Sequence, residues 1–313
     1  MKAGVIGSVK STETTIKCLY KNDFEIVGIL GYDPENRETV SGFKDLSIIA
    51  NKLNIPYRGY RKINDIENIE WMAKYKPDII FAVGFSQLLS DKWLNIPLLG
   101  CVGFHPTYLP KGRGRAPIAW IILEERVGAA TFFLMSTGAD DGPIFIQVPF
   151  TVEKEEDGNT LRKKIELSMI EALDKWLPDL KKGIWNPVPQ DEALASWYGK
   201  RTPLDGIINW NNSAENIDLL IKASTDPYPG AYTFLNEKKV IIYKSRIEKN
   251  IPIKGIVGRV LLIKEKQYLI QCGNGLLWVY DIIGTNDLKV GDKLGYNIEY
   301  EIYTIKNQLS QQA

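Results

Sequence analysis

A single histidine, His105, is the residue of this chain best suited to acid–base chemistry. Histidine is the only side chain whose ordinary pKa lies near neutral pH, so an imidazole base in this protein must be His105. The residue lies in the stretch Gly100–Pro117, where two prolines stiffen the chain and Gly112 and Gly114 let the backbone approach a ligand closely. These residue types indicate an acid–base site, although a histidine that only caps a turn would fit the same spacing.

Two aspartates, Asp140 and Asp141, are the candidate partners of this imidazole. They lie in the turn Ser136–Pro143, directly after the apolar run 130–135, which we expect to be a strand. Since neighbouring parallel strands bring their carboxyl ends to one edge of a sheet, His105 is expected to face one of these aspartates. A carboxylate beside an imidazole fixes its tautomer and favours its protonated form, which suits a base that accepts the proton of an amine. The alternative is that the aspartates only shape a glycine turn.

The first ~150 residues must supply the elements that position these groups, and they alternate between strand and helix patterns. Apolar runs predict strands at 3–6, 24–30, 79–83 and 130–135, and helical spacing predicts helices at 14–19, 43–53, 118–123 and 160–177, the last closed by Pro178 and Gly183. The run 79–83 is uninterrupted, as in strands that are buried on both faces. We therefore predict an α/β fold with a parallel, Rossmann-like sheet.

The fragment Gly4-x-x-Gly7 lacks the third glycine of a dinucleotide fingerprint and is interpreted as a tight turn.

A change of composition near Tyr198 predicts a second domain. One helix is expected at 214–224, followed by short strands at 231–235, 239–245, 258–263, 268–272, 275–282 and 296–302. Glycine and asparagine turns separate several of these runs, as in a small β-barrel. The predicted organisation is a catalytic domain over 1–188, a linker over 189–203 and a β-rich, barrel-like domain over 204–313.

The composition argues against several classes of function. Lysine and arginine (39) exceed aspartate and glutamate (38) by only one, which gives no bulk attraction to a nucleic acid. The cysteines Cys18, Cys101 and Cys272 are too scattered to make metal-ligand spacing, so we expect buried, reduced thiols and no metal site. No run approaches the ~20 apolar residues of a membrane span, and the apolar N-terminal stretch is too short for a signal peptide. We therefore expect a cytoplasmic protein without membrane association.

The stretch Gly100–Pro117 and the turn around Asp140 together resemble the signature of the 10-formyltetrahydrofolate-dependent formyltransferases. This family includes the methionyl-tRNA, glycinamide ribonucleotide and sugar-nucleotide N-formyltransferases, and the similarity spans nearly the whole chain. Segments 111–117, 198–210 and 226–231 most resemble the sugar-nucleotide members, such as the UDP-4-amino-4-deoxyarabinose formyltransferase. The resemblance implies a formyltransferase domain followed by a small β-barrel related to the C-terminal domain of methionyl-tRNA formyltransferase.

The resemblance also implies roles for individual residues. His105 falls on the catalytic histidine of the family and Asp140 on its aspartate. The loop that binds the pterin of the cosubstrate, 10-formyltetrahydrofolate, corresponds to Phe85, Ser86, Gln87 and Leu88. No metal is implied.

One position departs from the family pattern, because this chain has Gly103 where the family has asparagine. The resemblance implies that the asparagine helps to hold the formyl oxygen, and loss of such a donor typically lowers a rate by about 10²–10³-fold. Three hypotheses follow. A neighbouring donor (Thr107, Gln87 or a backbone N–H) takes its role, a water fills the space with slower turnover, or formyl transfer has been lost.

The acceptor is predicted from the charge of the second domain. From residue 204 onward the chain has 13 Lys/Arg and 12 Asp/Glu, which is not the basic footprint of a tRNA-binding domain. We therefore predict a small-molecule acceptor, the amine of a nucleotide-linked amino sugar. Arg113, Arg115 and Arg201 are candidates for binding its phosphates, since a guanidinium can hold a phosphate through two parallel hydrogen bonds. The alternatives are hydrolysis of 10-formyltetrahydrofolate, formylation of methionyl-tRNA, and a catalytically silent folate or nucleotide-sugar binding protein. A homodimer is an expectation from the family alone.

Overall fold

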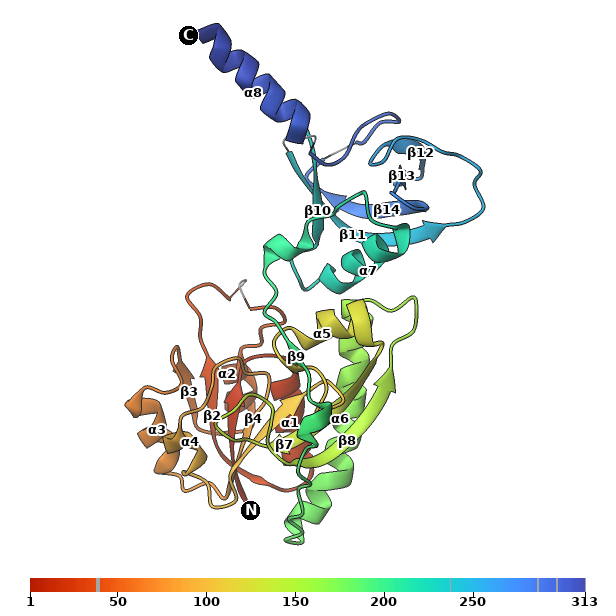
Figure 1. Ribbon diagram of the computed structural model, residues 1–313. Helices are drawn as coiled ribbons and strands as arrows, with labels where there is room; N and C mark the ends of the chain where they lie inside the picture. Colours follow the sequence, from red (N-terminus) through yellow and green to blue (C-terminus); the bar gives the residue numbers. More distant parts are fainter. Residues whose placement is uncertain (38–39, 237, 286, 297, 313) are drawn as a thin grey trace. The chain divides into compact units, whose positions relative to one another are not determined.

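The computed structural model describes residues 1–313 apart from 38–39, 237, 286, 297 and 313, and it divides the chain into two compact units (Figure 1). The first unit comprises Met1–Glu156 and Thr160–Lys200, and the second comprises Asp157–Asn159 and the chain from Arg201 onward. Most of the segment 189–203, expected to be a linker, therefore packs with the first unit.

The first unit is built on a seven-stranded sheet with the strand order β3-β2-β1-β4-β5-β7-β8. Its strands are β1 (Lys2–Gly7), β2 (Glu25–Tyr32), β3 (Tyr57–Tyr60), β4 (Ile79–Ala82), β5 (Cys101–His105), β7 (Val127–Leu134) and β8 (Ile144–Thr151). The first five of these pair in parallel, which confirms the predicted α/β class with a mostly parallel sheet. The expectation of parallel pairing is wrong for β7, which runs antiparallel to both β5 and β8.

Helices cover both faces of this sheet because its central strands are apolar on both sides. Phe81 of β4 belongs to a core that includes residues of α1 (Lys10–Lys21), α2 (Leu46–Lys52) and α6 (Gly158–Lys181). The adjacent Ile80 belongs to a second core, with residues of α3 (Ile66–Ala73) and α4 (Asp91–Leu94). Successive residues of one strand thus enter opposite cores, as the period of two in a strand requires.

Several predicted helix ends differ from the observed ones; the helix expected at 14–19, for example, is α1 at Lys10–Lys21. Helix α2 begins at Leu46 rather than Phe43, because the side chain of Asp45 accepts a hydrogen bond from the backbone N–H of Ser47 and caps the helix. Helix α6 continues through Pro178 to Lys181, so Pro178 does not close it. The helix predicted at 118–123 consists of α5 (Pro117–Trp120) and a π-helical turn at Ile121–Glu125.

A two-stranded pair outside the main sheet fixes the segment that follows His105. Strand β6 (Arg113–Gly114) pairs in parallel with β9 (Trp197–Tyr198). The backbone N–H of Gly112 also donates to Oγ of Ser196 at 2.9 Å. The glycine-rich loop is therefore held by a segment that lies more than eighty positions further along the chain.

The second unit is a five-stranded antiparallel sheet with the order β10-β11-β14-β13-β12. Its strands are β10 (Ala231–Leu235), β11 (Lys238–Glu248), β12 (Val260–Lys264), β13 (Gln267–Gln271) and β14 (Leu276–Ile283), and α7 (Ala214–Ser224) packs on it. The segment 292–295 hydrogen-bonds to both end strands: Val260 donates to the carbonyl of Asp292, and Gly295 donates to that of Phe234. The sheet thereby closes in the manner of the predicted small barrel.

The last predicted strand, 296–302, is wrong. The chain instead forms α8 (Ile298–Gln312), while residue 297 lies outside the described residues. In the part of the chain that the structure describes, no helix is long and apolar enough to cross a membrane.

Candidate active site

His105 lies at the end of β5, almost entirely buried, with 5% of its surface exposed. Its Nδ1 lies 3.4 Å from Oδ2 of Asp140, and its Nε2 lies 2.9 Å from the carbonyl oxygen of Gly112. The structure thus brings together the imidazole and one of its two predicted carboxylate partners. A neutral imidazole carries one N–H and can donate to only one of these two oxygens, whereas an imidazolium donates to both.

Asp140 reaches His105 by a different route from the one predicted. Because β7 is antiparallel to β5, its carboxyl end at Leu134 pairs with Val102 near the start of β5, and not with His105. The loop after β7 must therefore fold back along the sheet to bring Asp140 to the imidazole. Asp140 adopts φ 56°, a left-handed conformation that is unfavourable for a residue with a Cβ.

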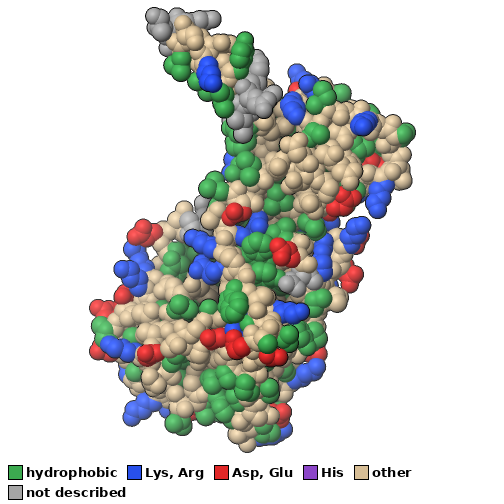
Figure 2. All heavy atoms as spheres, in the orientation of Figure 1, with side chains coloured by type: hydrophobic (Ala, Val, Ile, Leu, Met, Phe, Trp, Pro, Cys, Tyr) green, Lys and Arg blue, Asp and Glu red, His purple; other side chains and the backbone are tan. Residues whose placement is uncertain are grey.

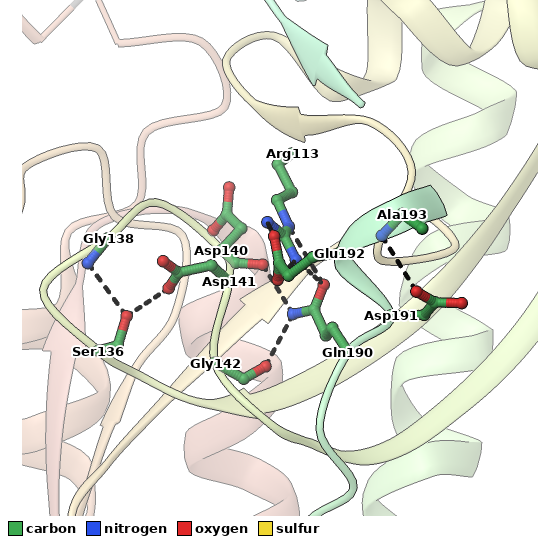
Figure 3. Close-up of polar contacts among 10 residues, drawn as sticks. All are labelled: Arg113, Ser136, Gly138, Asp140, Asp141, Gly142, Gln190, Asp191, Glu192 and Ala193. Carbon is green, nitrogen blue, oxygen red and sulfur yellow. Dashed lines mark hydrogen bonds and ion pairs between the residues drawn. The ribbon is translucent and has the colours of Figure 1, made fainter. Parts of the chain in front are cut away.

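The loop also distinguishes between the two candidate aspartates. Oδ2 of Asp140 accepts a hydrogen bond from the backbone N–H of Gly114 at 2.9 Å, in addition to facing the imidazole. Asp141 is turned toward Ser136, whose hydroxyl donates to it and accepts from the N–H of Gly138 (Figure 3). Asp140 is therefore the carboxylate that faces the imidazole, and Asp141 closes the turn.

The structure contradicts the predicted phosphate-binding role of Arg113. Its side chain is 1% exposed and donates four hydrogen bonds, two to Glu192 and two to Oε1 of Gln190 (Figure 3). The guanidinium also lies over the ring of Trp197, 5.5 Å from its centroid. The hydrogen bonds to Glu192 raise the pKa of Arg113 and lower that of Glu192. A guanidinium enclosed in this way cannot present a fork to a phosphate.

The other two predicted phosphate ligands, Arg115 and Arg201, lie in different environments. Arg115 is exposed, and its backbone N–H donates to the carbonyl of Tyr198. Arg201 belongs to the second unit, where its guanidinium donates to the carbonyl of Asp205 at 3.1 Å. Partial burial lowers the pKa of Arg201. Both remain candidate ligands.

The predicted pterin loop, Phe85–Leu88, is held by hydrogen bonds to the segment before α3. The amide of Gln87 accepts from the N–H of Ile63 and donates to the carbonyl of Arg61, both at 2.9 Å. Asn64 donates to the carbonyl of Leu88, whose side chain is exposed. Because the amide of Gln87 is engaged at both ends, it is a poor candidate to replace the asparagine missing at Gly103.

Gly103 lies opposite Phe133 across the pair β5–β7, and the ring of Phe133 fills the space beside it. A Cβ added at Gly103 would lie 2.6 Å from Cζ of Phe133, far inside normal contact. An aromatic ring thus occupies the place that a side chain at position 103 would need. Thr107 remains a candidate donor, since its hydroxyl is buried and has no hydrogen-bond partner among the described residues.

Gln190 and Glu192, the partners of Arg113, were not predicted as site residues. They lie in a proline-containing stretch that composition assigns to a linker, and the contacts join positions 77 and 79 apart in sequence. No local pattern signals such a long-range contact.

The cysteines match their prediction: all three are free and buried, and burial raises the pKa of Cys18 to about 11 and that of Cys101 to about 12. These thiols are therefore poor nucleophiles.

Known proteins resemble this chain in sequence and in fold. The bifunctional polymyxin resistance protein ArnA of Wigglesworthia glossinidia brevipalpis is 34% identical over 233 residues, which cover 74% of this chain and 36% of that protein. The chain thus spans about a third of the length of that relative.

Two solved structures share the fold at low sequence identity. An N-formyltransferase from Helicobacter canadensis, in complex with folinic acid and dTDP-3-aminofucose, has a TM-score of 0.67 and 17% identity over 90% of this chain and 98% of that one. WlaRD, a sugar 3N-formyl transferase, has a TM-score of 0.66 and 18% identity over 92% of this chain and 99% of that one. Residues 8–176 match the formyl transferase family, and residues 200–290 match the formyl transferase C-terminal domain. The chain therefore belongs to the formyl transferases, a family of enzymes that transfer formyl groups.

Proposed function

We propose that this protein transfers the formyl group of 10-formyltetrahydrofolate to the amine of a nucleotide-linked amino sugar. The observation that carries the proposal is the contact between His105 and Asp140, a buried imidazole with Nδ1 at 3.4 Å from a carboxylate, in a chain of the formyl transferase family. An imidazole supported by a carboxylate is suited to take up the proton that an amine loses when it becomes an amide.

In the proposed mechanism the unprotonated amine attacks the formyl carbon, a new C–N bond forms, and the carbonyl electron pair moves to the oxygen. With the ring proton on Nδ1, which faces Asp140, the unprotonated Nε2 takes the proton from the amine nitrogen. In this tautomer Nε2 has no proton to donate to the Gly112 carbonyl, which lies 2.9 Å away. Asp140 stabilises the resulting imidazolium, which in turn stabilises the oxyanion. When the carbonyl re-forms, the bond from the formyl carbon to N10 breaks, and N10 takes the proton held by the His105 imidazolium. This step releases tetrahydrofolate and restores the neutral imidazole.

The sugar-nucleotide acceptor is supported by charge and by fold. Lysine and arginine are interspersed with aspartate and glutamate on the face shown in Figure 2, as expected from a net charge of +1. Such a surface does not favour a nucleic acid, whose binding requires clustered cations. The sugar 3N-formyl transferase WlaRD, and the N-formyltransferase in complex with dTDP-3-aminofucose, share the fold of this chain over nearly their whole length. Arg115 and Arg201 are the proposed phosphate ligands, and Phe85–Leu88 is the proposed pterin loop.

The proposal is tested by following release of tetrahydrofolate in the presence of UDP-, dTDP- and GDP-linked amino sugars. We expect His105→Ala and Asp140→Ala to lower kcat by about 10²–10⁴-fold. Asp141→Asn is the matched control, because Asp141 lies in the same turn but faces Ser136. Unchanged turnover in the His105 and Asp140 variants would overturn the assignment.

The alternatives give different results in the same assay. Tetrahydrofolate release without any amine indicates hydrolysis, and release only with methionyl-tRNA indicates a nucleic-acid acceptor. Thermal stabilisation by reduced folate and by a nucleotide sugar, without turnover, indicates a silent binding protein.

A further inference from the structure

Three consecutive residues, Gly112 to Gly114, connect the acid–base pair to a buried anchor. The Gly112 carbonyl contacts Nε2 of His105, and the Gly114 N–H donates to the same Oδ2 of Asp140 that faces the imidazole. Between them, the side chain of Arg113 points away into its enclosure of Gln190 and Glu192. Any displacement of Arg113 is therefore passed directly to both members of the pair.

Gln190 connects the same anchor to the pair from the other side. Its Oε1 accepts from Arg113, while its Nε2 donates to the carbonyls of Asp140 at 2.8 Å and of Gly142 at 2.7 Å (Figure 3). The left-handed conformation of Asp140, with φ 56°, is strained and persists only where the surroundings impose it. The two hydrogen bonds from one amide hold the turn in that conformation.

We propose that Arg113 and Gln190 are positioning residues, which together set the distance and angle between the Asp140 carboxylate and the His105 imidazole. Arg113 fixes Gly112 and Gly114, and Gln190 fixes the backbone of Asp140, so one hydrogen-bond network centred on the buried Arg113 determines both sides of the contact. The inference rests on the proposed function for its effect on turnover. The geometric part, that Gln190 controls the surroundings of His105, does not require turnover.

The variant Gln190→Glu separates two roles of Gln190: holding the side chain of Arg113, and holding the backbone of the Asp140 turn. A glutamate retains an oxygen acceptor for Arg113, so the anchor itself is preserved. It places an oxygen in the position of Nε2, against the carbonyls of Asp140 and Gly142, so the turn must move. Asp191→Asn is the matched control: residue 191 is adjacent, and its side chain caps Ala193 rather than contacting Arg113 or the Asp140 turn (Figure 3).

The first measurement uses the fact that the chain has one histidine. In protein labelled with ¹⁵N-histidine and free of histidine tags, the ring signals in an NMR spectrum come from His105 alone. We expect Gln190→Glu to shift these signals and Asp191→Asn to leave them unchanged. If Gln190→Glu does not fold, Gln190→Met, which is similar in size, takes its place. Methionine lacks both the donor to the Asp140 turn and the acceptor for Arg113, so this variant tests the combined role of Gln190.

The second measurement is steady-state kinetics. We expect Gln190→Glu to lower kcat by about 10- to 100-fold, with the KM of both substrates nearly unchanged, because misplacement of a catalytic group affects the chemical step. Asp191→Asn, whose side chain contacts neither Arg113 nor the Asp140 turn, should retain kcat.

The two readouts separate failure of the inference from failure of the proposed function. Unshifted His105 signals in a folded Gln190 variant overturn the inference, whatever the activity. Shifted signals with an unchanged kcat also overturn it, because the network would then not serve the reaction. An unmodified protein without transferase activity overturns the proposed function, while the NMR comparison still decides whether Gln190 positions the pair.

Discussion

Gly103 and Phe133 form a pair of coupled residues beside the imidazole. The resemblance to the family implies an asparagine at position 103; the glycine found there has no side chain, and the ring of Phe133 fills the space. An asparagine introduced at position 103 alone would therefore force two side chains into one volume.

We expect Gly103→Asn to destabilise the protein by about 1–3 kcal/mol through overpacking against Phe133. In a double-mutant cycle with Phe133→Ala, the double variant should be markedly more stable than the sum of the single effects predicts. Urea unfolding at neutral pH measures all four proteins. Additive effects would show that the two residues do not compete for space.

Thr107 provides a second residue-level prediction, because its buried hydroxyl has no hydrogen-bond partner among the described residues. An unsatisfied buried hydroxyl typically costs about 1–3 kcal/mol, so Thr107→Val, which has nearly the same shape, should leave the protein at least as stable. If this hydroxyl donates to the formyl oxygen in place of the family asparagine, kcat falls by about 10²–10³-fold in the same variant. Thermal unfolding and tetrahydrofolate release are compared on one preparation. A stable variant with full kcat would exclude Thr107 as the donor.

At the level of elements, the helices and strands with regularly spaced apolar residues were predicted. Elements that depend on contacts between distant parts of the sequence were not. Helix α7 and strand β10 have the predicted bounds, since apolar spacing alone marks them. The run 296–302 was assigned to a strand for its β-branched and aromatic residues. Ile298, Ile302, Ile305 and Leu309 are, however, spaced by four, three and four, which is the spacing of a helix face.

The site shows the same division. A contact between His105 and an aspartate of the turn 136–143 was predicted because the histidine is unique and the turn follows a strand, whereas the choice of Asp140 over Asp141 came from the family resemblance. The antiparallel direction of β7 and the role of Gln190 could not be found, because both depend on pairing between segments that are remote in sequence.

The cap of α2 gives a prediction that depends on pH. The hydrogen bonds from Ser47 lower the pKa of Asp45, so the folded state binds this proton more weakly than the unfolded state. The contribution of Asp45 is therefore fully present above its unfolded pKa of about 4 and is lost as the pH falls through the lower folded pKa. We expect Asp45→Ala to cost about 1 kcal/mol near neutral pH. The difference from the unmodified protein, measured by urea unfolding, should shrink between about pH 5 and pH 2. A difference that is constant over this range would contradict a charged cap.

At the level of the whole molecule, each of the two units has its own apolar core. The first unit is centred on residues such as Phe81 and Phe132, and the second on Ile242, Ile270 and Leu277. A unit with its own core can unfold as a unit of its own.

We expect Leu277→Ala to destabilise the second unit by about 2–5 kcal/mol, because Leu277 is fully buried and its truncation leaves a cavity. The ring signals of His105 report on the first unit during the same denaturant titration and should be lost at the same urea concentration as in the unmodified protein. Loss of these signals together with the unfolding of the second unit would show a single cooperative transition.

The pairing of β6 with β9 also imposes an order on biosynthesis. A nascent chain that has left the ribosome only as far as β8 already contains His105 and Asp140, but not the residues that lock them in place. The aspartate turn and the glycine-rich loop acquire their final geometry only after residues 190–198 have been translated and have docked. The last segment of the first unit to be translated is therefore the one that completes the site. A premature stop shortly before Gln190 would yield a product that contains His105 and Asp140 but lacks the contacts that hold them together.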